Sequence, residues 1–522
     1  MIQLTKDNFY LFCLFFLSVS INFYSANNGV LPIDTFLHYD SSSNILRGNI
    51  PIRDYWIVHG FTLDYMQALF FKIFGVNWFG YIMHSSIFNV IITIATFKFF
   101  LLFNIKSFYA FLLAVSFSIL AYPVSGTPFI DQHAIFFCLL SYYLFFFGVK
   151  KDPRYFYFIP LFFILAFFSK PVPTAYLTIM FGIILTYYFY AHKDSDVFKK
   201  LILGSFFSIL VLISFILIQN INLNMFLTQL VYYPASIGQD RLLTLDINLK
   251  KIISNYKFII LPLLTFIILF LIQKRNKREK EKELLFLFLV FLSFNIISIY
   301  HQLLTKNQNF IFFLIPINLS FLILILENFK WDKSKIKLGI LVLFVFCLFT
   351  TAKYYQRFIV EKKFHDLQNV NLNNFVPAQK IHESLKYLKW KTLRYDQPIE
   401  EINLIREVLK ELTKEKEAIL LMSNYNFISS TTQKRIVMLS RTYDDISFPS
   451  KKSQYYMTFK NFFLEKVDTN DISKIYLVFP ENEIEDNANR YIYEYFNKEC
   501  FSVKKVNNIL TKFNFNNCKS SK

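Results

Sequence analysis

Glycine and cysteine are scarce in this chain, which has 11 glycines and 5 cysteines among 522 residues. It contains no GxxxxGK[ST] motif, no GxGxxG after an expected strand, no GxSxG and no HExxH. A glycine loop that cradles phosphate is therefore hard to place, which argues against the use of nucleotides or nucleotide-sugars on a cytoplasmic domain. The cysteines form neither a CxxC pair nor a zinc-binding pattern.

Charged residues are also few, at 18% of the chain against about 25% in an average soluble domain. Hydrophobic residues make up 54%, and they occur in runs too long for a soluble core. The 66 phenylalanines accompany abundant Ile, Lys and Asn, as an AT-rich genome would produce. We therefore interpret them as core or lipid-facing residues, and we assign the chain to the polytopic membrane proteins.

Eleven apolar runs approach the length of about 20 residues that a membrane-spanning helix needs. They are residues 8–24, 79–103, 108–124, 132–149, 155–169, 174–191, 201–219, 257–272, 284–300, 310–326 and 338–352. The sequence after the first run, "FYSANNG", lacks a small-x-small cleavage pattern, so we expect a retained helix and not a signal peptide. The predicted fold class is a polytopic α-helical membrane protein with about eleven transmembrane helices.

Lys and Arg are distributed unevenly between the connecting loops. With a cytoplasmic N-terminus, the inner loops 104–107, 150–154, 192–200, 273–283 and 327–337 hold seventeen of them, and the short outer loops 125–131, 170–173 and 301–309 hold two. This asymmetry follows the positive-inside rule. The net charge of +19 is then explained by the basic inner loops that orient the protein in the membrane, together with a basic tail. Nucleic acid is therefore not an expected partner.

This orientation divides the chain into a transmembrane domain, residues 1–352, and an outer domain, residues 353–522. In the outer domain, "FVPAQKIHESLKYLKW", "IEEINLIREVLKELTKEKE" and "ANRYIYEYFNKE" are typical of helices, and "AILLMS" and "KIYLVFP" of buried strands. We expect a small α/β domain. An oxidising compartment would permit a disulfide between Cys500 and Cys518, and that pairing stays open.

The long outer loop 25–78 carries the pattern of a folded segment. Ser41–Ser43 are placed as a helix N-cap and Gly48 as a stop, and a second helix is expected from Thr62 to Gly75. The second helix has an apolar face formed by Leu63, Met66, Phe70 and Phe74. We expect the loop to lie folded against the membrane surface.

The same loop contains "ILRGNIPIRDYWIVHG" followed by "YMQALFFKIFG". This order resembles the first outer loop of the GT-C superfamily of membrane glycosyltransferases, in the group of the protein mannosyltransferases and the lipid A aminoarabinose transferase. The matching positions are Ile45, Leu46, Gly48, Pro51, Arg53, Asp54, His59, Gly60 and Ala68 to Gly75. Two positions depart from the pattern: Asp34 is followed by Thr35 and not by a second acid, and Gly60 by Phe61 and not by proline.

The resemblance implies that a sugar is taken from a polyprenyl-phosphate donor on the outer leaflet. An outer-loop aspartate would act as general base or orient the acceptor, and nearby cations would stabilise the leaving phosphate. The superfamily contains metal-dependent and metal-free members, so a divalent cation stays open. The missing second acid after Asp34 removes one potential metal or acceptor ligand.

Two acids are the catalytic candidates. Asp34 lies ten residues past the first span and is our candidate base, although it could instead cap a turn. Asp131 precedes the fourth span, with His133 two residues on, and could equally cap that helix. We expect both carboxylates to meet in one outer cleft, where they would bind the acceptor or hold a divalent cation. Asp40 is more typical of an N-cap.

Several further side chains are candidates for substrate binding. Arg53 and Asp54 form either a substrate contact or a surface ion pair. A phosphate or an acceptor would be bound by Lys170, Arg241, His301 and His59, with Lys306 close to His301. Arg makes bidentate phosphate contacts better than Lys, and a lone lysine at a span end could instead extend to lipid headgroups. Together the cations would form an anionic-lipid pocket.

The sequence thus predicts a glycosyltransferase that uses a polyprenyl-phosphate sugar, with a glycan, lipid or protein as acceptor. One alternative is a polysaccharide polymerase or ligase, a class that usually has a large late outer loop rich in Arg and His, whereas here the large loop is the first. Another is a flippase or transporter of lipid-linked sugars, which would place ionisable residues at mid-span. The tail contains no N-x-S/T sequence, which favours a bacterial inner membrane over the endoplasmic reticulum.

Overall fold

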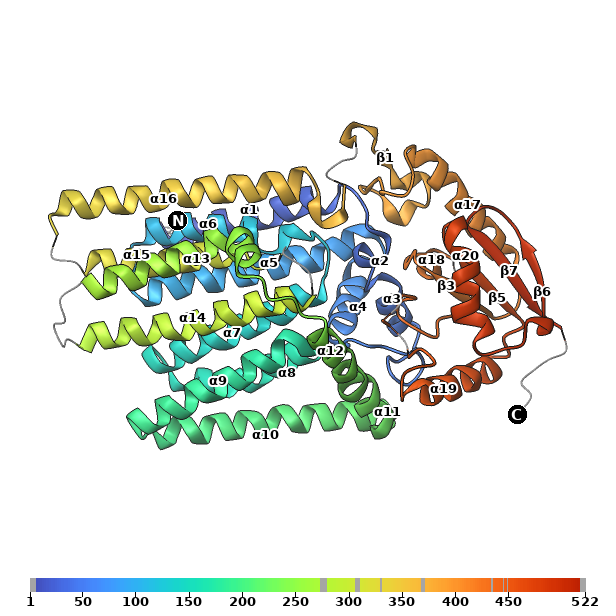
Figure 1. The fold of residues 1–522 in the computed structure, drawn as a ribbon, viewed down its shortest axis with the longest axis horizontal. Coiled ribbons are helices and arrows are strands. Elements are labelled where there is room, and N and C mark those ends of the chain that lie inside the picture. The colour runs from blue at the N-terminus through green and yellow to red at the C-terminus, as the bar shows by residue number, and fades with distance from the viewer. Residues whose placement is uncertain are drawn as a thin grey trace, which may run out of the picture.

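The computed structural model describes residues 6–272, 279–305, 310–328, 331–367, 371–432, 435–444, 446–447 and 449–516. Long helices lie side by side along one half of the molecule, and a mixed sheet with its helices forms the other half (Figure 1). The 25–78 loop lies between the two halves. We call the second half the C-terminal sheet region, residues 376–516.

Each of the eleven predicted runs forms a helix. The bundle helices are α1 (Lys6–Ala26), α5 (Trp78–Leu102), α6 (Ser107–Leu120), α7 (Ile130–Lys150), α8 (Ile159–Phe167), α9 (Pro171–His192), α10 (Ser195–Ile218), α13 (Leu249–Ile272), α14 (Glu279–Thr305), α15 (Leu314–Glu327) and α16 (Lys333–Tyr355). Nine helical segments among the described residues are long and apolar enough to cross a membrane. The segments 153–167 and 314–327 are apolar but shorter, so a count of eleven spans stays a prediction.

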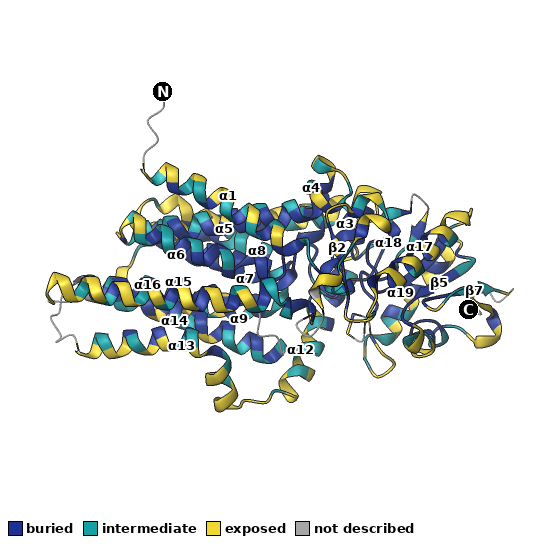
Figure 2. Cartoon of the chain, turned by 90° about the horizontal axis from the view of Figure 1, so that it is seen from above, coloured by how far each residue is buried: buried dark blue, intermediate teal, exposed yellow. Residues whose placement is uncertain are grey.

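Burial separates the central helix of the bundle from the helices at its surface. In the most apolar window of α7, 83% of the residues are buried, whereas in α10 the share is 17%. Yet α10 has the higher mean hydropathy, 2.8 against 1.5. An apolar surface this exposed is unfavourable in water, and we expect it to contact lipid. Figure 2 shows exposed residues along the outer helices and buried ones in the bundle interior.

The 25–78 loop folds into α2 (Pro32–Thr35), α3 (Tyr39–Leu46) and α4 (Thr62–Phe74). The predicted ends at Gly48 and Gly75 are confirmed, and both glycines have positive φ angles, 90° and 82°. The prediction that Ser41–Ser43 form an N-cap is wrong, because α3 begins at Tyr39 and the serines are buried within it.

The buried face of α4 differs from the predicted one, because this helix packs between α3 and α5. Of the predicted face, only Leu63 is buried. The other buried residues include Asp64, Gln67 and Phe71, so that polar side chains of α4 point inward.

A second connection leads from α10 to α13 through α11 (Leu223–Leu227), a wide turn at Thr228–Tyr232 and α12 (Tyr233–Leu243). It lies at the same end of the bundle as the 25–78 loop (Figure 1). This connection carries Arg241 to that end.

The C-terminal sheet region has five strands in the order β4-β3-β5-β7-β6. The strands β3 (Ile419–Ser423), β4 (Ile436–Val437) and β5 (Lys474–Val478) are parallel, and β6 (Phe501–Lys505) and β7 (Leu510–Phe515) are antiparallel additions. One face packs on α17 (Pro398–Lys414), and the other on α19 (Tyr456–Thr469) and the segment after α20 (Ile484–Ala488). Alternate residues of β3 enter the two cores, as strand geometry requires.

The predicted helix over 399–417 and the strands "AILLMS" and "KIYLVFP" are confirmed as α17, β3 and β5. The prediction of a helix over 375–390 is wrong. This segment forms the strand pair β1 (Val376–Pro377) and β2 (Lys389–Trp390), which are joined by 3₁₀ turns. The buried Trp390 indole donates to Glu401 of α17, which fixes the end of the segment against the sheet region. The helix expected over 488–499 is a wide turn after α20 followed by irregular structure.

Cys500 is buried. Its predicted partner Cys518 lies outside the described residues. The disulfide therefore stays a prediction.

Candidate functional site

The 25–78 loop approaches the bundle closely at Gly60. A Cβ atom at this position would lie 1.7 Å from the carbonyl oxygen of Phe168. The next residue but one, Thr62, donates its N–H to the same oxygen at 2.9 Å. Only glycine fits here, and the contact holds His59 beside the turn that carries Lys170.

Three of the predicted site residues meet at this end of the bundle. Lys170 Nζ lies 2.7 and 2.8 Å from the two carboxylate oxygens of Asp131, and His301 Nε2 lies 2.9 Å from Oδ1. We call Asp131, Lys170 and His301 the acid–cation cluster. They come from α7, from the turn between α8 and α9, and from α14.

The acid–cation cluster is almost sealed from solvent, since the side chains of Asp131 and His301 are 6% and 1% exposed. A carboxylate buried so deeply is stable only with partners of this kind. The alternative role of Asp131 as a helix cap is wrong, because α7 has no side-chain cap and the carboxylate contacts the two cations instead.

Asp34 lies in α2, near the acid–cation cluster, but its surroundings are different. Burial, followed by the negative charge of Asp131, raises the pKa of Asp34 to about 7. Within the described part of the chain, its half-buried carboxylate makes no hydrogen bond or ion pair. The turn is held by Thr35, whose hydroxyl accepts from Leu31 N at 2.9 Å, so Asp34 does not cap it.

Three cavities adjoin one another at Ile446, which lines all of them. The span-side cavity, of about 630 Å³, is lined by Arg241, Lys251, Tyr256 and Gln302. The central cavity, of about 60 Å³, is lined by His59, Lys170 and Arg241. The domain-side cavity, of about 560 Å³, is lined by Asp34 and by residues of the C-terminal sheet region. Asp34 and the cations therefore face neighbouring spaces.

The basic side chains around the central cavity differ in charge. Burial and then the charge of Lys170 lower the pKa of His59 far below its usual range, so its imidazole is neutral at pH 7. In the residues that the structure covers, the half-buried guanidinium of Arg241 has no acidic partner, although it lines both the span-side and central cavities. Arg241 is thus placed to meet an anion from outside the protein.

A second buried ion pair was not predicted from the sequence. Arg441, of the C-terminal sheet region, donates through Nη2 to Asp64 of α4 and, at 2.9 Å, to the carbonyl oxygen of Gly60. Asp64 also lies 2.6 Å from His38 Nδ1 and accepts from Ser41 at 2.6 Å. Burial alone would raise the pKa of Asp64, but the charge of Arg441 holds it below its usual range.

No sequence signal links Asp64 and Arg441, which are 377 residues apart. The only hint was an acid within the helix predicted from Thr62 to Gly75. The pair fixes the carbonyl of Gly60, next to His59, so the C-terminal sheet region shapes the site as well as covering it.

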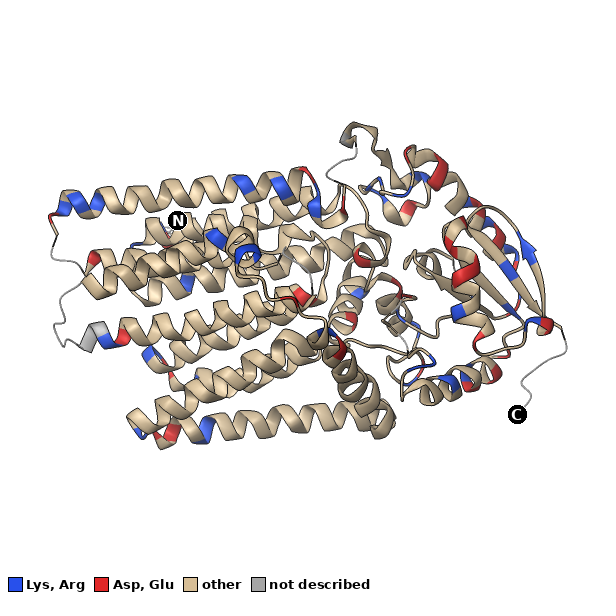
Figure 3. Ribbon diagram, in the orientation of Figure 1, with Lys and Arg blue, Asp and Glu red and all other residues tan. Residues whose placement is uncertain are grey.

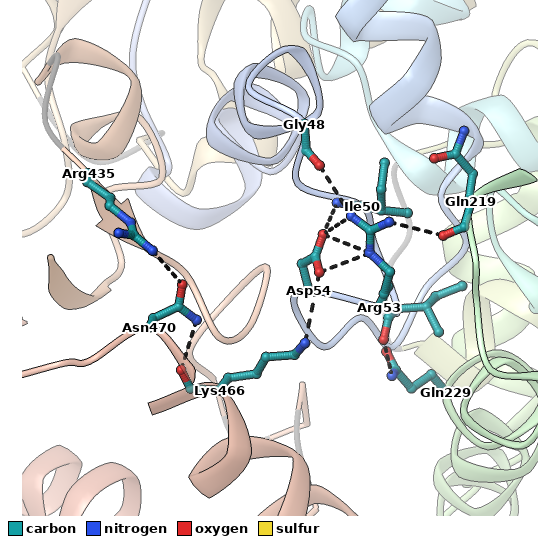
Figure 4. A network of polar contacts seen from close by, with 10 residues as sticks. Gly48, Ile50, Arg53, Asp54, Gln219, Gln229, Arg435, Lys466 and Asn470 are labelled. Carbon is teal, nitrogen blue, oxygen red and sulfur yellow. Dashed lines mark hydrogen bonds and ion pairs between the residues drawn. The ribbon is translucent and has the colours of Figure 1, made fainter. Parts of the chain in front are cut away.

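Arg53 and Asp54 do not join the acid–cation cluster. They pair with each other at 2.7 Å, and Arg53 donates to the carbonyl oxygen of Gln219 at 3.1 Å, at the end of α10 (Figure 4). Asp54 also accepts from Ile50 N at 2.7 Å and lies 3.9 Å from Lys466 Nζ of α19. In this position the pair joins the 25–78 loop to the bundle and to the C-terminal sheet region.

Asp40 has a similar joining role. Its carboxylate accepts from the backbone N–H groups of Ser429 and Ser430, at 3.1 and 2.7 Å. These N–H groups belong to the first turn of α18 (Ile428–Thr431) in the C-terminal sheet region. The prediction that Asp40 caps its own helix is wrong, because it lies inside α3 and its carboxylate instead binds the first turn of a helix far along the chain.

The described residues offer no metal site: no three His, Cys, Asp or Glu side chains among them lie close enough to share an ion. Both oxygens of Asp131 face Lys170 Nζ. The divalent cation that the sequence left open stays a prediction.

The helix bundle and the sealed acid–cation cluster at its end define an integral membrane protein with a polar site at one end of the bundle. Residues 58–219 match the family model described as dolichyl-phosphate-mannose-protein mannosyltransferase. Over this segment the chain is similar to a family of membrane glycosyltransferases of the GT-C type. The match includes His59, Asp131 and Lys170 and ends before Arg241. No curated protein matches the chain.

Proposed function

We propose that this protein transfers a sugar from a polyprenyl-phosphate donor to a hydroxyl-bearing acceptor at the outer face of the membrane. The observation that supports this most is Asp34, a half-buried carboxylate without a protein partner among the described residues, beside the acid–cation cluster. A carboxylate with a raised pKa and a free approach is suited to accept a proton from a nucleophile. Asp34 is the general base in this proposal.

The reaction is a single displacement at the anomeric carbon. The acceptor hydroxyl oxygen forms a bond to that carbon, and its proton passes to the Asp34 carboxylate. The bond between the anomeric carbon and the phosphate oxygen breaks, and the electron pair leaves with polyprenyl phosphate. Cations beside that oxygen lower the free energy of the transition state because they are already in place when the charge develops.

Arg241 and Lys170 are the proposed phosphate contacts. Arg241 lines both the span-side and the central cavity, so a phosphate entering between the helices would meet it first. The ammonium of Lys170, 12% exposed, lines the central cavity while Asp131 orients it. Asp131 is thus a positioning residue in this proposal, and neutral His59 is available to hydrogen bond with the substrate.

The proposed orientation of the protein in the membrane is based on the distribution of Lys and Arg. Few charges lie along the middle of the helices, and Lys and Arg occur at both ends of the bundle, for example at the end of α16 next to the C-terminal sheet region (Figure 3). Among the short loops, however, those at the helix ends away from the C-terminal sheet region hold most of the Lys and Arg. By the positive-inside rule those ends are cytoplasmic, so the C-terminal sheet region is outside. We propose a bacterial inner membrane as the location.

The experiment is a transfer assay on the purified protein in lipid nanodiscs, with a panel of polyprenyl-phosphate sugars. We expect Asp34→Asn to lower turnover about 10²- to 10⁴-fold, the usual contribution of a general base. Asp196→Asn is the matched control, because Asp196 is exposed at the start of α10, at the opposite end of the bundle. Unchanged turnover in Asp34→Asn would overturn the base assignment, and absence of transfer from every donor would overturn the donor class.

A further inference from the structure

The domain-side cavity lies at the carboxyl ends of two parallel strands. Asn424 follows β3 directly, Phe479 follows β5 directly, and both line the cavity. In the sheet, β3 lies between β4 and β5. The chain therefore passes from β3 to β4 on one side and then crosses to β5 on the other side of β3. In open α/β sheets, ligands bind outside the carboxyl ends of the strands at such a reversal of strand order.

The volume and lining of the domain-side cavity fit a small polar ligand. Its volume, about 560 Å³, lies within the range of about 300–1,000 Å³ for small-molecule sites. Its lining includes aromatic rings as well as groups that donate or accept hydrogen bonds: Tyr443, Tyr491, Phe479, Asn424, Asn487 and Arg394. Sugars present hydroxyl groups that both donate and accept, and carbon faces that pack on aromatic rings.

One polar group of the lining is held in a fixed position. With its amide suitably turned, Asn424 donates to the carbonyl oxygen of Tyr443 at 3.0 Å and accepts from Arg394 Nη2 at 3.3 Å. The Arg394 guanidinium also lies 5.9 Å from the centre of the Tyr425 ring. These contacts orient the arginine at the cavity wall before any ligand binds, which reduces the ordering cost of binding.

The charge of the domain-side cavity is opposite to that of the neighbouring spaces. Asp34, Asp444 and Glu483 line it together with a single cation, Arg394. The span-side cavity, by contrast, carries Arg241 and Lys251 against Asp246. An anionic lipid phosphate is therefore favoured on the span side and disfavoured on the domain side.

We propose that the domain-side cavity binds the acceptor, and that the acceptor is a neutral saccharide whose hydroxyl reaches Asp34. This inference rests on the proposed function, because Asp34 is the base there. The lining also contains aliphatic side chains such as Leu31, Ile33 and Leu393, but the acids Asp34, Asp444 and Glu483 disfavour an anionic lipid there, and a neutral saccharide can meet both kinds of group. The acceptor and the donor then enter from opposite sides of Ile446, which borders both cavities.

The test uses Asn487→Ala and Glu483→Gln, two half-buried positions at α20 whose change leaves the cores intact. Asp486→Asn is the matched control, since Asp486 lies on the same helix, is exposed and does not line the cavity. In the transfer assay we expect KM for the acceptor to rise at least about tenfold, the effect of losing about 1.4 kcal/mol of binding. KM for the donor and the slow hydrolysis of the donor by water should not change.

Saturation-transfer NMR tests the cavity independently of transfer. The probes are neutral oligosaccharides of mannose, glucose and galactose, offered to the full-length protein in nanodiscs. We expect a saccharide signal with the wild type and with Asp486→Asn, and a loss of that signal with Asn487→Ala. Unchanged saccharide binding and acceptor KM in both cavity variants would overturn the inference while leaving the proposed function intact. Saccharide binding without transfer from any lipid-linked donor would overturn the proposed function alone.

Discussion

At the scale of single residues, two carboxylates near one site are separated by their surroundings. Asp131 is paired with a lysine and a histidine, whereas Asp34 is partly desolvated beside another negative charge. Environments of this kind assign different roles to chemically similar groups. We expect Asp131 to stay ionised and Asp34 to exchange a proton near neutral pH.

This difference predicts the pH dependence of the reaction. Because the pKa of Asp34 is about 7, kcat/KM should rise with pH up to about 7 and then level off, since the base must be deprotonated. Asp34→Glu should keep a measurable rise, and Asp34→Asn should show none. A profile measured between pH 5 and 9 checks this, and a wild-type rate that does not change through pH 7 would contradict it.

The same pKa affects stability. A carboxyl group whose pKa is raised in the folded state favours folding while it is protonated, and this contribution is lost as pH rises through about 7. Asp34→Asn should therefore melt at a higher temperature than the wild type at pH 8, and this difference should shrink as the pH falls toward about 4, the usual pKa of an aspartate. The melting temperature in nanodiscs measures this, and a variant that is less stable at pH 8 would show that Asp34 has a favourable partner.

Residue types alone predicted Asp131, Lys170 and His301 as candidates, because charged groups at span ends are costly without a function or a partner. Their mutual contact is a property of three helices packed together, which spacing along the chain does not encode. Asp64 and Arg441 gave no comparable signal, since one lies in an amphipathic helix and the other in a loop of the C-terminal sheet region.

At the scale of elements, the C-terminal sheet region holds the 25–78 loop through polar contacts, and three of these involve acids of the loop. Arg441 pairs with Asp64, Asp40 caps α18, and Lys466 lies beside Asp54. The first two are buried and the third is partly exposed. The buried contacts are expected to contribute most, because a charge left alone in the interior is costly.

The buried ion pair gives the second prediction. Asp64→Asn removes one charge and leaves Arg441 uncompensated, which should cost about 3–5 kcal/mol of stability. It should also lower turnover, because the Gly60 carbonyl beside His59 loses its support. Lys505→Ala, which breaks the exposed pair with Glu481, serves as the control and should leave both stability and turnover unchanged.

Thermal unfolding and transfer rates measured on the same preparations test this prediction. If Asp64→Asn melts and transfers sugar like the wild type, the ion pair does not hold the loop.

The sequence could locate the spans, α17, β3 and β5 because each has a strong apolar period. It misjudged 375–390, where a buried Trp390 and a short strand pair override helix propensity.

At the scale of the whole molecule, the site is assembled from distant parts of the chain. The 25–78 loop supplies Asp34 and His59, the bundle supplies the acid–cation cluster, and the C-terminal sheet region supplies the far wall of the domain-side cavity. We propose from the charge of the short loops that this end of the bundle lies outside the cytoplasm.

Cysteine labelling tests this orientation. In a background without native cysteines, Lys504→Cys reports on β6 of the C-terminal sheet region and Lys193→Cys on the turn after α9, and both positions are exposed. We expect a membrane-impermeant maleimide to label Lys504→Cys in intact cells, and Lys193→Cys only after the membrane is opened. The reverse pattern would place the site on the cytoplasmic side and contradict the proposal.

The central claim is that Asp34 and Lys170 act within a single site. The most direct measurement is kcat/KM for transfer by the wild type, Asp34→Asn, Lys170→Gln and the double variant. Groups that act as a unit give non-additive effects, so we predict that the double variant is scarcely slower than the slower single variant. Losses that multiply in full would mean that the two residues act independently, and the account of one shared site would be wrong.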